Sequence, residues 1–307
     1  MRFFKQALFL LGLFIILLSG FFETAAETQT EKNTRRGELT IGLVPELNLF
    51  KQVERYEPLA NYLSGRPGFR VRLKIFSRYG DVIDEFAHGR LDSAFLGSCT
   101  CVLAHIKSDV EIVARPVNIF GRPTYHGLIF VRKDSGIRTI THMRGQRFAF
   151  VDKATTAGYL FPITFFKKYG IEDSHTYFNE TYFSGTYQDA VYDVLDGKAD
   201  VGAGKNTVLA RLAAADGRIK NELAFLERSV EIPENCFALG NALEGSVRHK
   251  LTDTLLNMHI TTESLNILKE LGVQRFVAAS IKDYSDISKF AQKVGLNLEK
   301  YDYMGQR

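Results

Sequence analysis

The chain has 307 residues, a formal net charge of +4, 45% hydrophobic and 24% charged residues, no Trp and three Cys. These proportions are those of globular proteins, so they exclude a collagen-like, an intrinsically disordered and a disulfide-framework chain. The length is about twice that of a usual domain and favours two domains or two lobes of one fold. The small positive excess forms no basic stripe, so we predict no nucleic-acid partner.

The N-terminal segment, residues 1–26, has the pattern of a secretory signal peptide. Arg2 and Lys5 precede an apolar run over residues 7–22, and small residues follow it. This order predicts export, with cleavage after residue 26 and a flexible leader over residues 27–37. The run is short for a transmembrane helix, but an uncleaved membrane anchor stays open as an alternative. We therefore predict a periplasmic or extracytoplasmic location.

Three cysteines in an oxidising compartment leave at least one thiol without an intramolecular partner. Cys99 and Cys101 are too close in sequence for an easy mutual disulfide, whereas Cys236 could reach either. A Cys-x-Cys pair without a second pair or a nearby His cluster gives weak support for zinc. We interpret Cys99 and Cys101 as small buried residues near a turn.

An internal repeat aligns residues 79–94 with residues 187–202 without a gap. In each copy, apolar residues follow the spacing of an amphipathic helix that begins at a tyrosine, Tyr79 or Tyr187. A glycine suited to a helix end follows, and a short apolar stretch entered through an aspartate then predicts a buried strand. The repeat therefore predicts the same helix and strand at two places in the chain.

The same order of elements extends upstream of each copy. The first half is predicted to contain strand 39–44, helix 56–63, strand 70–76, a helix from residue 79 and strand 91–96. The second half is predicted to contain strand 147–152, helix 159–169, strand 176–183, a helix from residue 187 and strand 199–203. This alternation is typical of a parallel α/β sheet. Chance similarity stays the alternative, because glycine-capped helices before apolar strands are common.

Two segments, residues 125–132 and 230–239, are predicted to cross between the halves. Two α/β lobes joined in this way place a crevice at the carboxyl ends of their strands, where ligands bind. Residues 243–300 are predicted to be mainly helical. Six apolar residues of this region are expected to pack on the first lobe: Leu251, Leu255, Met258, Leu265, Leu268 and Leu271.

The segment 152–158, Asp-Lys-Ala-Thr-Thr-Ala-Gly, leaves a predicted strand and opens a predicted helix. Backbone N–H groups and the hydroxyls of Thr155 and Thr156 can converge there on one anion. Ala157 and Gly158 would let a ligand approach the backbone closely. An ordinary helix N-cap is the alternative, and the position at the presumed crevice favours the anion site.

Three tyrosines and a lysine complete the predicted site. Tyr79 and Tyr187 begin equivalent helices, so each phenol could donate a hydrogen bond to an oxyanion, although either could be a half-buried core residue. Tyr125 lies on a crossing segment and would close the third side. Lys205 ends a strand and would add positive charge.

Motifs for catalysis are missing from the sequence. There is no His-Glu-x-x-His and no Gly-x-Ser-x-Gly, and the seven histidines are scattered. Cys101 and His105 are four residues apart, but no third group that would orient them is evident. We therefore predict a binding protein with no catalytic residue, no metal and no cofactor.

Seven segments carry a resemblance to a known family: residues 56–63, 79–97, 114–116, 125–131, 133–137, 148–162 and 232–233. They are similar to the periplasmic substrate-binding proteins of phosphate, phosphite and phosphonate ABC transporters. The resemblance covers residues 39–271, and its most specific part runs from Phe150-Val151-Asp152 to Pro162. It implies a type II periplasmic-binding fold of two α/β lobes, each a mixed sheet flanked by helices, with the ligand in the cleft between them.

The resemblance also implies lobe boundaries. The first lobe would comprise residues 38–125 and 232–307, and the second lobe residues 126–231. The family's hydroxyl cluster falls on Thr155, Thr156 and Ala157, where Ala157 lacks a hydroxyl. The cleft tyrosines of the family fall on Tyr79 and Tyr125.

Two further positions of the family bear on the ligand. A histidine that binds phosphonate oxygens falls on Tyr187, or on Thr186 if the alignment shifts by one. Aminophosphonate binders hold the ligand's ammonium group with acidic residues near the positions of Thr207 and Asn235. Neither residue is acidic here, although Glu234 is adjacent, so the resemblance favours a ligand without an amine. Asn235 is counted among the predicted ligand-binding residues.

The resemblance thus implies an exported, monomeric, solute-binding component of an ABC transporter. It would close around phosphate, phosphite or a simple phosphonate by a hinge motion and deliver it to a permease in the inner membrane. Two alternatives stay open. One is a ligand sensor that acts on a membrane receptor, and the other is a binder of a different small anion such as a sulfonate.

Overall fold

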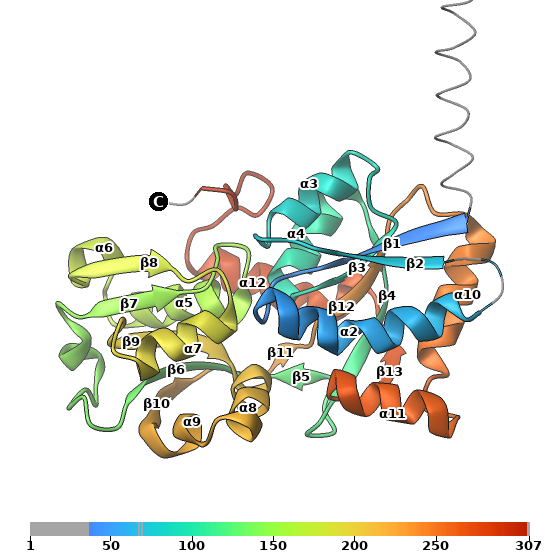
Figure 1. The fold of residues 1–307 in the computed structure, drawn as a ribbon. Helices are drawn as coiled ribbons and strands as arrows, with labels where there is room; N and C mark the ends of the chain where they lie inside the picture. The colour runs from blue at the N-terminus through green and yellow to red at the C-terminus, as the bar shows by residue number, and fades with distance from the viewer. Residues whose placement is uncertain (1–36, 67, 69, 306–307) are drawn as a thin grey trace, which may run out of the picture.

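The computed structural model describes residues 37–66, 68 and 70–305, so the predicted signal peptide lies outside the described residues. Within them the chain forms a six-stranded sheet, a five-stranded sheet and a two-stranded ribbon. Figure 1 shows the two large sheets side by side, each flanked by helices, with the ribbon between them. We call the six-stranded sheet with its helices the first lobe and the five-stranded sheet with its helices the second lobe. In this part of the chain, no helix is long and apolar enough to cross a membrane.

The strands of the first lobe lie in the order β13-β4-β12-β3-β1-β2. They are β1 (Glu38–Leu43), β2 (Arg70–Ile75), β3 (Ser93–Leu96), β4 (Glu111–Asn118), β12 (Cys236–Leu239) and β13 (Val273–Ala278). The helices are α2 (Leu49–Ser64), α3 (Asp81–Ala87), α4 (Ser98–Ser108), α10 (Gly245–Leu256) and α11 (Thr262–Leu271). β1 pairs in parallel with β2 and β3, as the predicted alternation requires. The sheet is mixed because β12 returns from the second lobe and runs antiparallel to β3 and β4.

The strands of the second lobe lie in the order β10-β6-β9-β7-β8. They are β6 (Gly127–Arg132), β7 (Arg147–Phe150), β8 (Glu180–Phe183), β9 (Val201–Lys205) and β10 (Leu223–Arg228). The helical elements are η2 (Ile140–Met143), η3 (Thr156–Leu160), α5 (Phe161–Lys168), α6 (Ser174–Tyr177), α7 (Tyr187–Leu195), α8 (Asn206–Ala215) and α9 (Gly217–Glu222). β7 pairs in parallel with β8 and β9, whereas β6 and β10 add antiparallel strands. The mixed sheets that the family resemblance implies are therefore confirmed in both lobes.

Two short strands, β5 (Thr124–Tyr125) and β11 (Ile232–Pro233), form the ribbon between the lobes. They pair antiparallel, with Tyr125 opposite Ile232. The chain enters the second lobe through β5 and returns through β11, so both predicted crossings are present. The predicted lobe boundaries fall at this ribbon and remain a prediction.

The sequence repeat corresponds to two equivalent units of structure. α3 followed by β3 occupies the same place in the first lobe as α7 followed by β9 in the second. The glycines after the two helices, Gly89 and Gly197, have φ angles of 64° and 74°, a left-handed conformation that suits glycine. The repeated aspartates hold the neighbouring strand: Asp92 accepts from Thr40 N at 2.7 Å, and Asp200 accepts from Arg147 N at 2.9 Å.

Some predicted elements are wrong in extent or type. The expected strand 176–183 begins with the helix α6, and only residues 180–183 form a strand, because Asp173 caps a helical turn by accepting from His175 N. The expected helix 56–63 begins seven residues earlier, at Leu49, where Asn48 provides the N-cap. The C-terminal region contains β13 as well as helices, and Leu265 is 45% exposed, unlike the other five apolar residues expected to pack on the first lobe.

The two lobes are in contact across the cleft. One hydrophobic cluster contains buried side chains of both lobes, including Tyr79 and Tyr187. Thr100 Oγ1 donates to the carbonyl oxygen of Ala154 at 2.9 Å, and Gln188 N donates to that of Glu46 at 3.3 Å. The lobes are therefore in a closed arrangement, the state that a ligand touching both lobes would favour.

The chain after β13 connects the two lobes a further time. η4 (Ile281–Tyr284) and α12 (Ser285–Lys293) pack against α4 of the first lobe, and α12 also contacts α5 and η3 of the second. We call residues 294–305 the C-terminal strap. Its Glu299 carbonyl accepts from Lys107 of the first lobe. Tyr301 then donates to the Lys153 carbonyl of the second lobe at 3.1 Å, and Tyr303 donates to Asp84 of the first at 3.2 Å.

Candidate ligand-binding site

The predicted anion-binding segment, residues 152–158, leads from β7 into η3, which is a π-helical turn. Thr155 precedes this turn with an extended backbone, φ −110° and ψ 143°. Its Oγ1 donates to the Asp152 carbonyl at 2.5 Å, and Ala154 N donates to Asp152 Oδ1 at 2.8 Å. Leu160 N donates to the carbonyl of Thr155 at 3.2 Å, the five-residue spacing of a π turn. Turns of this kind are frequent at functional sites.

Thr156 carries a buried hydroxyl without a hydrogen-bond partner among the described residues. The residue is 1% exposed. It lies close enough to Tyr125 to lower the pKa of that phenol, but the contact does not meet hydrogen-bond geometry. A buried polar group without a partner costs about 1–3 kcal/mol. An oxyanion bound here would remove that cost.

Tyr79 and Tyr187 meet across the cleft, one from each lobe. Their rings are nearly perpendicular, with centroids 6.3 Å apart and an interplanar angle of 80°. Burial raises the pKa of both phenols well above the ordinary value, so both stay protonated hydrogen-bond donors. The Tyr79 hydroxyl donates to the carbonyl of Pro45 at 3.1 Å. The proton that was expected to point to an oxyanion is therefore already used in a hydrogen bond within the protein. Thr186, the alternative to Tyr187, accepts from Asp189 N as the N-cap of α7.

Tyr125 lies on the ribbon and is joined to Ser98, a residue that the sequence analysis missed. Ser98 Oγ donates to the Pro233 carbonyl at 2.8 Å, so the Tyr125 hydroxyl, 3.1 Å away, donates to Ser98. Burial raises the pKa of Tyr125 to about 12, although Lys205, Ser98 and Thr156 each act to lower it.

The repeat contained a signal for Ser98. Extending the alignment a few residues beyond the strand places Ser98 opposite Asn206, and both begin a helix directly after it. Asn206 Oδ1 accepts from His126 N at 2.8 Å, next to Tyr125 in the chain. Both helix-opening residues therefore bind a crossing segment.

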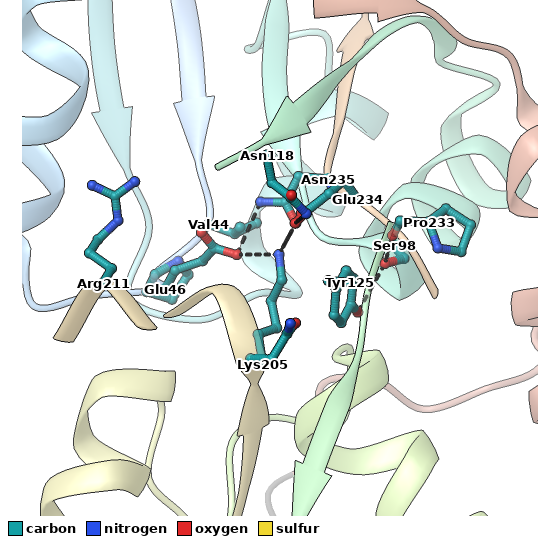
Figure 2. Close-up of polar contacts among 12 residues, drawn as sticks. Val44, Glu46, Ser98, Asn118, Tyr125, Lys205, Arg211, Pro233, Glu234 and Asn235 are labelled. Atoms are coloured by element: carbon teal, nitrogen blue, oxygen red, sulfur yellow. Dashed lines mark hydrogen bonds and ion pairs between the residues drawn. The ribbon is translucent and has the colours of Figure 1, made fainter. Parts of the chain in front are cut away.

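Lys205 is buried at the end of β9, and its charge is already paired (Figure 2). Its Nζ contacts Glu46 Oε1 at 3.1 Å, Glu234 Oε2 at 3.0 Å and Asn235 Oδ1 at 2.9 Å. The expectation that Lys205 adds free positive charge to the anion site therefore needs correction. Its buried partners neutralise that charge. Asn235, expected to contact the ligand, instead contacts Lys205 and donates to Glu46 at 3.1 Å.

Glu46 is the most strongly held carboxylate of this group. It is 2% exposed, and its second oxygen accepts from Arg55 at 3.0 Å. Burial alone would raise the pKa of Glu46. The charges of Lys205 and Arg55 and the hydrogen bonds from Asn235 and Lys205 outweigh burial and lower the pKa to about 2. Glu46 stands three residues after β1, at the carboxyl end of a strand, where a functional residue is expected.

A cavity of about 240 Å³ borders this charged group between the lobes. Its lining includes Glu46, Lys205, Thr207, Arg55 and Arg211. Burial, together with the nearby Arg55, lowers the pKa of Arg211 to about 10. In the described ranges, no group of His, Cys, Asp and Glu is arranged to hold a metal ion.

Two small residues of the segment 152–158 serve packing. Ala157 is fully buried in the cluster shared by both lobes. A Cβ added to Gly158 would lie 2.4 Å from Val151 Cβ and 2.8 Å from Thr155 Oγ1. The expectation that Gly158 admits a ligand is therefore wrong, since its missing side chain admits Val151 and the Thr155 hydroxyl.

Asp152 gives the segment a pH-dependent element. Burial raises the pKa of Asp152 to about 6, against the opposing effects of hydrogen bonds from Ala154 N and Tyr79 N and of Arg78. A folded-state pKa above the unfolded value means that this carboxyl contributes full stability below about pH 4 and that the contribution is lost as pH rises through about 6. Asp152→Asn is therefore expected to be more stable than wild type by about 2 kcal/mol at pH 7.5 and nearly equal to it at pH 4.

Urea unfolding at both pH values measures this difference. Asp253→Asn, at an exposed position of α10, is the matched control and should leave stability unchanged at both. A difference for Asp152→Asn that does not grow with pH would contradict the assignment.

The arrangement resembles solved structures of two-lobed binding proteins. A binding protein component of an ABC phosphonate transporter from Pseudomonas aeruginosa is 22% identical, with a TM-score of 0.80 over 84% of this chain and 87% of that one. PhnD1 of Prochlorococcus marinus in complex with methylphosphonate is 21% identical, with a TM-score of 0.76 over 84% of this chain and 98% of that one. The fold is thus that of the two-lobed periplasmic binding proteins.

Comparison with protein families identifies the family within this fold class. Residues 41–284 match the family described as ABC transporter, phosphonate, periplasmic substrate-binding protein. The chain belongs to this family. It is also 24% identical over 222 residues to the phosphate-import protein PhnD of Mycolicibacterium smegmatis. The matched region covers 69% of each chain.

Proposed function

We propose that the protein is the extracytoplasmic binding component of an ABC transporter and that it closes around a small phosphorus oxyanion without changing it chemically. The candidate ligands are phosphate, phosphite and a simple phosphonate. The observation that carries the proposal is the buried set of hydroxyls at the junction of the lobes, with Thr156 Oγ1 unpartnered beside Tyr125 and Ser98. Phosphorus oxyanions accept several hydrogen bonds, and the Thr156 hydroxyl has a proton to donate, whereas those of Tyr125 and Ser98 would have to turn from their present partners.

The wider assignment follows from family membership and the N-terminal sequence. The protein would be exported by a signal peptide over residues 1–26, act as a monomer in the periplasm and dock on a permease in the inner membrane. Tyr79, Tyr125, Thr155, Thr156 and Tyr187 would surround the anion, with Ser98 orienting Tyr125. Ala157 would provide packing.

A binding experiment tests this proposal directly. Residues 27–307 are unfolded and refolded to remove bound ligand, then titrated with phosphate, phosphite, methylphosphonate and an alkylsulfonate by calorimetry. We expect saturable binding of a phosphorus oxyanion and a rise in Tm on the order of several degrees at 100 times the dissociation constant. Folded protein that binds none of them, or that prefers the sulfonate, would overturn the assignment.

Thr156→Val should separate binding from stability. Valine has nearly the same shape but no hydroxyl, so the oxyanion affinity is expected to fall about 10- to 100-fold. The stability of the free protein should stay equal or increase by about 1 kcal/mol, because the hydroxyl has no partner there. Calorimetry and urea unfolding measure the two effects.

Thr155→Val is the comparison for this variant. The Thr155 hydroxyl already donates to Asp152, so its removal should lower stability as well as affinity. If Thr156→Val lowers stability without lowering affinity, its hydroxyl has a structural role and the proposed site is wrong.

A further inference from the structure

Lys205 lies in a pocket whose shape and charge suit an ammonium group. The Lys205 ammonium has three N–H donors, and three oxygens lie within 3.1 Å of it, from Glu46, Glu234 and Asn235. All four residues are between 2% and 6% exposed. The face of the Tyr125 ring covers the ammonium at 4.3 Å from the ring centroid, a distance typical of a cation–π interaction. We call Glu46, Glu234, Asn235 and the Tyr125 face the cation subsite.

Groups other than Lys205 hold the cation subsite in place. Arg55 binds the second oxygen of Glu46 at 3.0 Å, and Asn118 donates to the second oxygen of Glu234 at 3.2 Å. Asn235 N also donates to Glu234 at 3.2 Å. Arg55 and Asn118 belong to α2 and β4 of the first lobe, and Asn235 lies between β11 and β12, on the return from the ribbon. The carboxylate groups of Glu46 and Glu234 are therefore held by side chains and backbone groups other than Lys205, although the Glu46 carbonyl also accepts from Gln188 N of the second lobe at 3.3 Å.

Lys205, by contrast, enters from the second lobe at the end of β9. It is the occupant of a pocket that another part of the molecule builds. The paired carboxylates raise the pKa of Lys205 despite its burial, so the occupant stays charged. An ammonium group on a ligand would present the same charge and the same three donors.

Tyr125 connects this pocket to the proposed anion site. Its hydroxyl edge faces Ser98 and Thr156, and its ring face covers Lys205 Nζ. A ligand with an oxyanion at one end and an amine at the other would thus meet the Lys205 ammonium on the far side of this ring. The ammonium group of the ligand and that of Lys205 would repel each other. Glu46 and Glu234 already pair with Lys205 and would not compensate the second positive charge.

We propose that Lys205 is a built-in occupant of the cation subsite and that it restricts the protein to phosphorus oxyanions without an ammonium group. This inference rests on the proposed function, because it names the ligand class of the same cleft. The adjoining cavity of about 240 Å³ leaves room for a small amine when the lysine side chain is shortened.

Two ligands of almost equal size test the selectivity of the wild-type protein. Ethylphosphonate and 2-aminoethylphosphonate differ by the ammonium group. We expect calorimetry to show ethylphosphonate binding at least 10-fold more tightly. Equal affinity, or preference for the amine, would overturn the inference without recourse to any variant.

Shortening the lysine should reverse this preference. Lys205→Ala is expected to bind 2-aminoethylphosphonate at least 10-fold more tightly than ethylphosphonate, because the ligand then supplies the missing ammonium. Lys220→Ala, at an exposed position of α9 in the same lobe, should keep the wild-type order. A Lys205→Ala protein that folds and keeps the wild-type order would contradict the inference. If this variant does not fold, the wild-type comparison decides.

A free amine separates the cation subsite from the proposed function. The Tm of Lys205→Ala is expected to rise by several degrees in ethylammonium chloride relative to sodium chloride at equal concentration, whereas Lys220→Ala should show no difference. Rescue by the amine in a protein whose wild type binds no phosphorus oxyanion would support the built-in occupant and overturn the proposed function. A folded Lys205→Ala that gains nothing from the amine would show that the pocket is no cation subsite.

Discussion

Glu46→Gln is expected to lower the stability of the free protein by about 3–5 kcal/mol at pH 7, the usual cost of breaking a buried ion pair from one side. The substitution leaves Arg55 and Lys205 facing a neutral amide in a buried position, with only Glu234 to balance them. The Tm should fall by on the order of 10 °C. Thermal and urea unfolding measure the effect.

The same variant should also change the acid limb of the stability curve. Because the folded-state pKa of Glu46 is depressed to about 2, its stabilisation is present above the unfolded pKa of about 4.3 and is lost as pH falls through 2. The difference between wild type and Glu46→Gln should therefore shrink as pH falls from 5 toward 2. Glu54→Gln, exposed on α2, is the control and should lose little at any pH. A Glu46→Gln protein as stable as this control would refute the ion-pair assignment.

Gly158→Ala is expected to affect both stability and binding. The added methyl would lie 2.4 Å from Val151 Cβ and 2.8 Å from Thr155 Oγ1, so η3 must move away from the end of β7. Overpacking of this kind costs about 1–3 kcal/mol. The movement would displace the Thr155 and Thr156 hydroxyls together, so we expect the oxyanion affinity to fall about 100-fold or more.

Gly245→Ala provides the matched control for Gly158→Ala. A Cβ added at Gly245, the first residue of α10, would meet no atom within 4 Å. This change should leave the affinity unchanged and the stability equal or slightly higher. Calorimetry and urea unfolding on the three proteins decide the matter. Wild-type affinity in Gly158→Ala would mean that residues 152–158 lie outside the binding site.

The helices, strands and turns that the sequence predicts correctly are those that depend on local residue patterns. The spacing of apolar residues after Tyr79 and Tyr187 located two equivalent helices, and the strand that follows each is present. The segment with Thr155 and Thr156 leads from a strand into a helical turn, as expected. Periodicity and capping depend on neighbours within a few residues, so a single sequence contains them.

The partners of Lys205 could not be predicted in this way. Glu46 is 159 residues away in the chain and Glu234 is 29 residues away, and no periodic pattern relates them. Whether a lysine at a strand end faces a ligand or a buried carboxylate depends on what the other lobe presents. The role of Gly158 was misread for a similar reason, because the contact with Val151 forms only when η3 folds back on β7.

The C-terminal strap, residues 294–305, lies beyond the part of the chain that matches the family, which ends at residue 284. It is attached in succession to the first lobe by Lys107, to the second by Tyr301 and again to the first by Tyr303. A tether fastened alternately to two bodies becomes taut when they rotate apart. We therefore expect the few residues between these attachment points to limit how far the lobes can rotate apart. A wider opening of the cleft would then require the hydrogen bond of Tyr301 or of Tyr303 to break.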